Sequence, residues 1–260
     1  MSAPAGCIDF SMSAYNGEYI WIVGASSGIG RALAVELAAQ GAHLILSSRN
    51  EAALSALNDE LGGGHQVIAL DAGDHAALNA AAARLEKLDR VIFMAATYVP
   101  HEKNMKSIES VHSMLRVNLG GAFNVMHAAL PLFEKQGYGQ IALCGSVAGY
   151  RGLPFGQPYC AAKAGIINYA ESLKIECEAK NIDVKVINPG FVRTPLTDKN
   201  DFPMPMMIEA DEAARAIAKG LQGRAFEIHF PKRFTWLMKI LRLLPAPLYF
   251  WIARQLSAKV

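Results

Sequence analysis

Hydrophobic and polar positions along this chain follow two alternating patterns. From Ile20 onward, short apolar runs of the β type are separated by longer stretches rich in Ala and Leu. The short runs predict strands over Ile20–Gly24, His43–Ser47, Gln66–Leu70, Arg90–Met94, Gly139–Cys144, Val184–Ile187 and Ala225–Phe230. The longer stretches predict helices that begin near Gly28, Glu51, Asp74, Ser107, Pro158 and Ala210. Strands joined by crossover helices predict a doubly wound α/β fold, here one domain around a seven-stranded, mainly parallel sheet.

The pattern divides the chain into three parts. Residues 1–18 have neither a basic start nor a continuous apolar stretch, so they do not resemble a secretory signal, and we expect a poorly ordered lead-in. Residues 19–231 form the predicted domain, and residues 232–260 form a C-terminal extension of it. Within the domain, prolines interrupt the periodicity between Asp198 and Met207, which predicts a mobile loop of the kind that often covers a site.

Composition excludes several classes of function. The chain has 25 basic and 23 acidic residues, a balance that gives no support to a nucleic-acid-binding surface. Its four cysteines form no Cys-x-x-Cys pair, which favours a reducing, cytoplasmic location. The seven histidines form no metal-binding motif, so we expect no metal site.

A glycine-rich turn lies between the first predicted strand and the first predicted helix. Glycines at such a turn let the backbone approach a pyrophosphate, and the free N–H groups at the helix start carry partial positive charge. A strand-to-helix turn can use glycine for structural reasons alone, but the strand before it and the helix after it favour phosphate binding. The residues expected to bind a dinucleotide here are Gly24, Ser26, Ser27, Gly28, Ile29 and Gly30.

A second set of polar residues has the character of a catalytic group. Tyr159 and Lys163 are four residues apart on a predicted helix, so both can reach one ligand, and no other of the eight tyrosines has a lysine at this offset. The spacing alone also fits an amphipathic helix whose lysine extends to solvent. Ser146 lies thirteen residues before Tyr159, after the fifth predicted strand, and Asn118 lies in the segment Arg-Val-Asn-Leu-Gly.

Together these segments resemble the short-chain dehydrogenase/reductase family. Gly24, Gly28 and Gly30 have the spacing of the family's T-G-x-x-x-G-x-G turn, with Val23 in place of the threonine, and residues 159–163 match its Y-x-x-x-K motif. The resemblance covers roughly residues 19–230. It implies a Rossmann fold that binds a nicotinamide dinucleotide and moves a hydride between it and a carbonyl or alcohol substrate.

The chemistry of hydride transfer gives Tyr159 its expected task. Hydride addition to a carbonyl develops negative charge on the oxygen, so a proton must be donated, and alcohol oxidation needs the reverse. Free tyrosine has a pKa of about 10, which a neighbouring Lys163 is expected to lower towards neutrality. The resemblance implies that Lys163 also holds the nicotinamide ribose, that Ser146 hydrogen-bonds the substrate oxygen, and that Asn118 helps to position water.

The end of the second predicted strand indicates which dinucleotide is used. An enzyme that prefers NAD would place an acid there to accept from the ribose hydroxyls, but the chain has Ser48 and Arg49 instead. Arg49 can form charge-assisted, fork-shaped hydrogen bonds to a ribose phosphate, with hydroxyls of Ser27 and Ser48 beside it. The alternative is a solvated arginine at a strand end. The sequence therefore favours NADP(H).

The resemblance implies further cofactor contacts at other strand ends. Asp71, beside the Ala72 backbone, would accept from the adenine amino group, although an N-cap or turn role is nearly as well supported. Ala95 would contact the cofactor through its backbone. Ala95 lies in the segment Phe-Met-Ala-Ala, where the family has N-N-A-G. Because both asparagines are missing, we expect packing, and not an amide side chain, to brace the sheet there. A segment that resembles the family's P-G-x-V-x-T implies contacts from Pro189, Gly190, Val192 and Thr194, unless it is a simple Pro-Gly turn.

The C-terminal extension lies beyond the family pattern. Apolar residues recur at helical spacing on both sides of Pro245 and Pro247, which predicts two short helices. Interspersed lysines and arginines together with Trp236 and Trp251 are typical of a segment at a membrane interface, while the charges and prolines argue against a span. Packing on the chain's own domain or on a partner subunit, where it would wall the substrate pocket, is the alternative.

These observations predict an NADP(H)-dependent oxidoreductase that acts on a small carbonyl or alcohol, apolar or lipid-derived, in the cytoplasm or at the inner face of a membrane. The alternative is an NADPH-binding sensor or scaffold without turnover. A serine hydrolase would need G-x-S-x-G, which Ser146 does not have. Apolar residues around two predicted helices predict a homodimer or homotetramer. These residues are Phe123, Val125, Met126, Ile166, Ile167 and Leu173.

Overall fold

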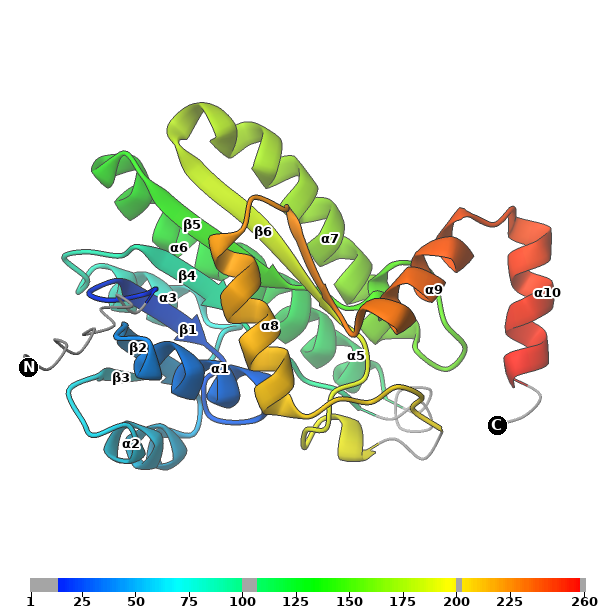
Figure 1. The fold of residues 1–260 in the computed structure, drawn as a ribbon, viewed down its shortest axis with the longest axis horizontal. Coiled ribbons are helices and arrows are strands. Elements are labelled where there is room, and N and C mark those ends of the chain that lie inside the picture. Colours follow the sequence, from blue (N-terminus) through cyan, green and yellow to red (C-terminus); the bar gives the residue numbers. More distant parts are fainter. Residues whose placement is uncertain (1–13, 100–106, 200–202, 258–260) are drawn as a thin grey trace, which may run out of the picture.

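Apolar runs of the sequence pair as parallel strands through the middle of the protein (Figure 1). The computed structural model describes residues 14–99, 107–199 and 203–257. Its strands are β1 (Tyr19–Val23), β2 (His43–Ser48), β3 (Gln66–Ala69), β4 (Arg90–Phe93), β5 (Gly139–Cys144), β6 (Ile182–Pro189) and β7 (Glu227–Phe230). Their order in the sheet is β3-β2-β1-β4-β5-β6-β7, with every pair parallel. The predicted fold class is confirmed, although β6 is longer and β7 shorter than the sequence indicated.

Helices cover both faces of this sheet. They are α1 (Gly28–Ala39), α2 (Glu51–Glu60), α3 (His75–Ala82), α5 (Ile108–Leu115), α6 (Gly121–Gln136), α7 (Gln157–Cys177), α8 (Ala210–Gln222), α9 (Lys232–Leu243) and α10 (Ala246–Ser257). Three of them begin where a side chain accepts a hydrogen bond from a free N–H of the first turn, namely α2 at Asn50, α3 at Asp74 and α5 at Ser107. The starts of these three helices lie within one residue of the predicted positions.

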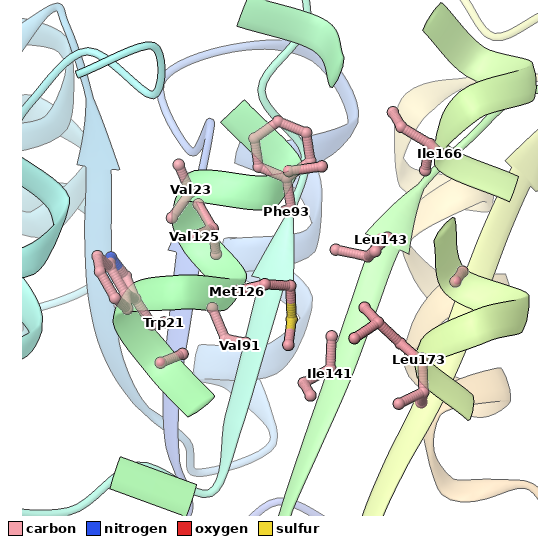
Figure 2. Packing of buried hydrophobic residues seen from close by; sticks show 14 of the residues in the cluster. Trp21, Val23, Val91, Phe93, Val125, Met126, Ile141, Leu143, Ile166 and Leu173 are labelled. Carbon is pink, nitrogen blue, oxygen red and sulfur yellow. The ribbon is translucent and has the colours of Figure 1, made fainter. Parts of the chain in front are cut away.

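Alternate side chains of the strands enter two separate cores, one on each face. One core packs against α1, α2 and α8. The other packs against α3, α6 and α7, as Figure 2 shows for Trp21, Val91, Phe93 and Ile141 of the strands. Five of the six helix residues that suggested an interface, all but Phe123, are buried in this second core. These five residues therefore do not support the prediction of an oligomer, because the sheet of the same chain covers them.

The segment before β1 is packed against the domain at Tyr15. The Tyr15 side chain is fully buried, and its hydroxyl donates to the carbonyl of Ala218 in α8. Glu18 forms an ion pair with Arg90 at the start of β4. The expectation of a poorly ordered lead-in is wrong for residues 14–18, because a single buried tyrosine can anchor a short segment. Residues 1–13 lie outside the described part of the chain.

The C-terminal extension forms the two predicted helices, and they differ in how they meet the domain. α9 follows β7 directly and packs on the sheet through Phe234 and Met238, whereas α10 projects from the body of the molecule (Figure 1). Within the described residues, no helix is long and apolar enough to cross a membrane. Residues 200–202 of the predicted mobile loop lie outside the described part. Its other residues include the end of a short 3₁₀ turn, Thr197–Lys199, and a turn at residues 205–206.

Candidate active site

A cleft of about 320 Å³ runs along the carboxyl edge of the sheet. Every residue predicted to contact the cofactor lines it, and so does Ser146, whereas Asn118 does not. The sequence did not single out these further lining residues: Val23, Asn50, Leu70, Met94, Ala96, Val117, Cys144, Gly145, Pro195, Leu196 and Thr197. All of them except Thr197 are next to, or within two residues of, a residue predicted for the site, and this proximity was the available signal.

Glycine is required where the turn after β1 meets the segment after β4. Gly24 has a φ of +105°, and a Cβ there would lie 2.4 Å from the backbone N of Ala95. A Cβ on Gly30 would lie 2.1 Å from the carbonyl oxygen of Gly24. The turn is therefore a backbone surface without side chains, which is the shape that a pyrophosphate needs for close approach.

The amino end of α1 has unoccupied hydrogen-bond donors at this surface. Ser27 is the N-cap residue, but its side chain makes no capping hydrogen bond. The side chain of Thr194 would lie 3.2 Å from a Cβ on Gly28, so the segment after β6 closely approaches the β1 turn at this point of the cleft. Backbone N–H groups and a helix dipole that face a cleft suit an anion. This part of the site fits a dinucleotide.

Arg49 follows β2 and lines the cleft beside Ser48 and Asn50. Its side chain is exposed, and it forms no ion pair with any residue that the structure describes. Beside it, the Ser48 hydroxyl accepts from the Asn50 N–H at 3.2 Å, and Asn50 caps α2. A guanidinium and a hydroxyl thus extend from neighbouring residues at the end of one strand, a combination that can bind a phosphate.

Asp71 uses its carboxylate within the chain. One oxygen accepts from the Gly73 N–H at 2.8 Å, and the other accepts from Arg116 at 3.1 Å. Partial burial would raise the pKa of Asp71, but the hydrogen bonds from Gly73 and Arg116 outweigh it and hold that pKa below its ordinary value. The structure thus assigns Asp71 the turn role that the sequence left open, while contact with adenine stays a prediction.

Tyr159, Lys163 and Ser146 converge at the other end of the cleft. Tyr159 and Lys163 lie in the first turns of α7, and Lys163 Nζ is 5.6 Å from the centre of the tyrosine ring. Lys163 is 1% exposed and donates to the carbonyl oxygen of Cys144 at 2.7 Å. Ser146 caps the turn after β5, where its hydroxyl accepts from the Ala148 N–H at 3.1 Å. The snorkelling alternative for Lys163 is wrong, because its ammonium group is buried.

Burial controls the charge of both titratable groups at this end. It raises the pKa of Tyr159 well above the ordinary value, aided by Cys144, while a hydrogen bond with Ser146 acts in the opposite direction. It also lowers the pKa of Lys163. The expectation that Lys163 lowers the pKa of Tyr159 is therefore wrong for the structure as it stands, because desolvation of the phenolate dominates.

Asn118 is fully buried in a π-helical turn, Arg116–Gly120, between α5 and α6. Its amide oxygen accepts from the Thr97 N–H at 2.7 Å, and its amide nitrogen donates to the Thr97 carbonyl at 2.8 Å. An amide side chain therefore does brace the segment after β4, contrary to our expectation, but it comes from a helix and not from the strand. Both ends of the amide thus hold the segment after β4 in place, while the role of Asn118 in positioning water stays a prediction.

Comparison with known proteins assigns the chain to a family. The family described as short chain dehydrogenase matches residues 18–203. An uncharacterized oxidoreductase of Myxococcus xanthus is 31% identical over 242 residues, which cover 90% of this chain and 96% of that protein. The chain therefore belongs to the short-chain dehydrogenase family of oxidoreductases, enzymes that act on CH–OH and C=O groups.

Solved structures share the fold. A short-chain dehydrogenase from Sphingobium yanoikuyae in complex with NADPH has a TM-score of 0.76 at 24% identity, covering 88% of this chain and 97% of that one. A short-chain dehydrogenase/reductase from Burkholderia phymatum in complex with NAD has a TM-score of 0.78 at 23% identity, covering 86% and 92%. Both nicotinamide dinucleotides thus occur on this fold.

Asn118→Leu should lower the free energy of unfolding by about 1–3 kcal/mol, because it leaves a part-buried N–H and carbonyl of Thr97 unpaired. Chemical denaturation measures this change. Asn79→Leu on α3, where the side chain is exposed, is the matched control. Equal stability of the two variants would show that the brace contributes nothing.

Proposed function

We propose that this protein is an NADP(H)-dependent oxidoreductase that reduces a carbonyl group. The observation that carries the proposal is the placement of Tyr159, Lys163 and Ser146 in the same cleft as the glycine turn and Arg49. A nucleotide-binding surface and a proton donor are therefore parts of one continuous site. Such a combination serves hydride transfer, in which the cofactor must lie beside a general acid.

The residues of the cleft would hold the dinucleotide at three places. The turn at Gly24 and the amino end of α1 would bind the pyrophosphate, and Arg49 with Ser48 would bind the 2′-phosphate of NADP(H). Lys163 would hold the nicotinamide ribose, and Val192 with Thr194 would hold the nicotinamide amide. When bound, the nicotinamide would supply the hydride.

Tyr159 would donate the proton that the reduced oxygen requires. Because burial raises its pKa, the phenol keeps its proton at neutral pH, which is the form needed for reduction. The Ser146 hydroxyl would donate a hydrogen bond to the substrate oxygen and stabilise the charge that develops on it. For alcohol oxidation the same phenol would first have to lose its proton, which its raised pKa opposes at neutral pH.

Lys163 would assist in two ways. Its amine is close enough to the Tyr159 ring to stabilise the phenolate that remains after proton donation. Its hydrogen bond to the Cys144 carbonyl fixes the side chain at the end of β5. An apolar or lipid-derived carbonyl is the proposed substrate, because the C-terminal extension places apolar side chains beside the loop that leads to Tyr159.

The proposal includes assembly of the protein as a homodimer or homotetramer in the cytoplasm. Phe123 on α6 is 46% exposed and stacks on Tyr169 of α7 at 3.9 Å between ring centres. These rings border a shallow groove that includes Met126, His127 and Leu130. The three cysteines in the described residues, Cys144, Cys160 and Cys177, are free, in keeping with a reducing compartment.

NADPH should bind at least tenfold more tightly than NADH, since a guanidinium–phosphate pair is expected to exceed ~1.4 kcal/mol. Arg49→Ala should remove most of that difference in titrations monitored by fluorescence. Arg31→Ala is the matched control, because Arg31 lies on α1 and pairs with Glu60 outside the lining of the cleft. Equal affinities for the two cofactors in the unchanged chain would contradict the assignment.

Tyr159→Phe should retain NADPH binding but lose ~10²–10⁴-fold in turnover with a panel of carbonyls, because only the transferable proton is removed. Tyr169→Phe, farther along α7, should keep full activity. In the unchanged chain, reduction should not decline between neutral pH and pH ~9 through loss of the phenol proton, since the pKa of Tyr159 lies above its ordinary value of about 10. NADPH binding without reduction of any carbonyl would support the sensor alternative instead.

Sedimentation velocity at micromolar concentration should show a dimer or tetramer. Phe123→Glu should shift the protein towards monomers, because it places a charge in the exposed apolar groove between α6 and α7. A monomer in the unchanged chain would contradict the proposed assembly, and an unchanged oligomer in Phe123→Glu would place the interface elsewhere.

A further inference from the structure

Exposed apolar side chains gather on the C-terminal extension. Half of the large apolar residues that are exposed within the described part of the chain fall between residues 236 and 251. They are Trp236, Leu237, Ile240, Leu243, Leu248, Phe250 and Trp251. Extended apolar surface of this kind marks a site of interaction with another molecule or with a membrane.

Helix α9 has two apolar faces. Phe234 and Met238 form the face that packs on the domain, and a Cβ on Gly190 at the cleft would lie 2.7 Å from the Phe234 ring. Trp236, Ile240 and Leu243 follow one another at helical spacing on the outer face, where Leu243 is 83% exposed. The domain covers only the face with Phe234 and Met238, so a different partner is expected to cover the outer face.

Helix α10 is apolar on nearly all sides. Of its side chains described between Ala246 and Gln255, only Tyr249 is buried, while Phe250 and Trp251 are more than half exposed. A helix that is apolar over most of its circumference lies in an apolar medium or against a partner. Pro245 and Pro247 separate it from α9, and neither helix is long enough to span a bilayer.

The charge of the extension indicates which partner or medium its apolar faces contact. The C-terminal extension holds six of the chain's 25 lysines and arginines and none of its 23 acidic residues. Arg233 and Arg254 are exposed, and Lys232 is also at the surface. The core of a protein–protein interface is depleted in charged residues other than arginine, whereas cations interleaved with tryptophan suit the headgroups and the acyl boundary of an anionic bilayer.

The extension is fixed firmly to the domain. The Arg151 guanidinium donates to the carbonyls of Leu241, Arg242 and Leu244 at the end of α9, at 3.4, 3.1 and 2.6 Å. It also lies 4.1 Å from the centre of the Tyr249 ring, whose hydroxyl donates to the Gly152 carbonyl. The exposed apolar faces of the two helices are thus held in a set position beside the loop that precedes Tyr159.

We propose that the outer face of α9 together with α10 is a docking surface for an anionic membrane, in which Trp236, Leu243 and Trp251 enter the interface and Arg233 and Arg254 contact lipid phosphates. The surface holds the protein at the bilayer as a peripheral protein. This inference concerns binding alone and does not depend on the proposed reaction.

Flotation with lipid vesicles tests the proposal on the full-length chain. Vesicles of phosphatidylcholine with phosphatidylglycerol should carry the protein upward, and pure phosphatidylcholine vesicles should carry much less of it. The double variant Arg233→Glu/Arg254→Glu should weaken partitioning by at least ~tenfold, since each cation near an anionic surface contributes measurably to binding. Trp236→Ser/Trp251→Ser should weaken partitioning to both kinds of vesicle.

Matched variants elsewhere serve as controls. Arg84→Glu/Lys219→Glu makes the same change in net charge on exposed residues of the domain, and Ile175→Ser removes an apolar residue of α7 that is 76% exposed. These should float like the unchanged chain, and circular dichroism should show all variants folded. Equal flotation of extension and control variants would overturn the proposal. The proposal would also be overturned if the unchanged chain did not float and the Trp236→Ser/Trp251→Ser variant lost its oligomers. That result would assign the surface to contact with a second copy of the chain.

Discussion

The parallel pairing of β1 with β4 is the interaction on which the site depends. From β1 the sheet grows to β2 and β3 on one side, and the chain then returns to place β4 on the other side. Connections leave these two strands in different directions, so a crevice opens at their carboxyl ends. Gly24 and Ala95 follow the two strands, and their backbones touch there. The other residues of the cleft lie at the neighbouring strand ends, on either side of the contact between Gly24 and Ala95.

Sequence patterns could predict those parts of the protein that depend on local periodicity. The seven strands, the glycine turn and the helical spacing of Tyr159 and Lys163 are of this kind, and the structure brings both segments to one cleft. Contacts that join distant segments could not be predicted in the same way. Tyr15 is buried against a carbonyl of α8, and nothing near it in the sequence indicates that partner.

Charges in the site illustrate the same limit. The sequence places a lysine near a tyrosine and so suggests a lowered tyrosine pKa, but burial of both groups has the larger effect. Asp71 likewise has a position that fits adenine, while its hydrogen bonds with Gly73 and Arg116 depend on a turn and a helix that only the folded chain brings together. Residue type predicted which groups line the cleft, and the fold determined their protonation and partners.

The π-helical turn at Arg116–Gly120 makes the position of Asn118 sensitive to chain length. A π turn contains one residue more than a regular α-helical turn, and each residue advances an α-helix by about 100°. Deleting a single residue within this turn would restore regular phase between α5 and α6. α5, the π turn and α6 already follow one another without a break, so the deletion would leave one helix but would rotate the Asn118 side chain by about 100° relative to the elements on one side of it. The hydrogen bonds between Asn118 and Thr97 therefore depend on the one extra residue of the π turn. Without that residue, the side chains of the helix would face other directions, although the order of the helices and strands would stay the same.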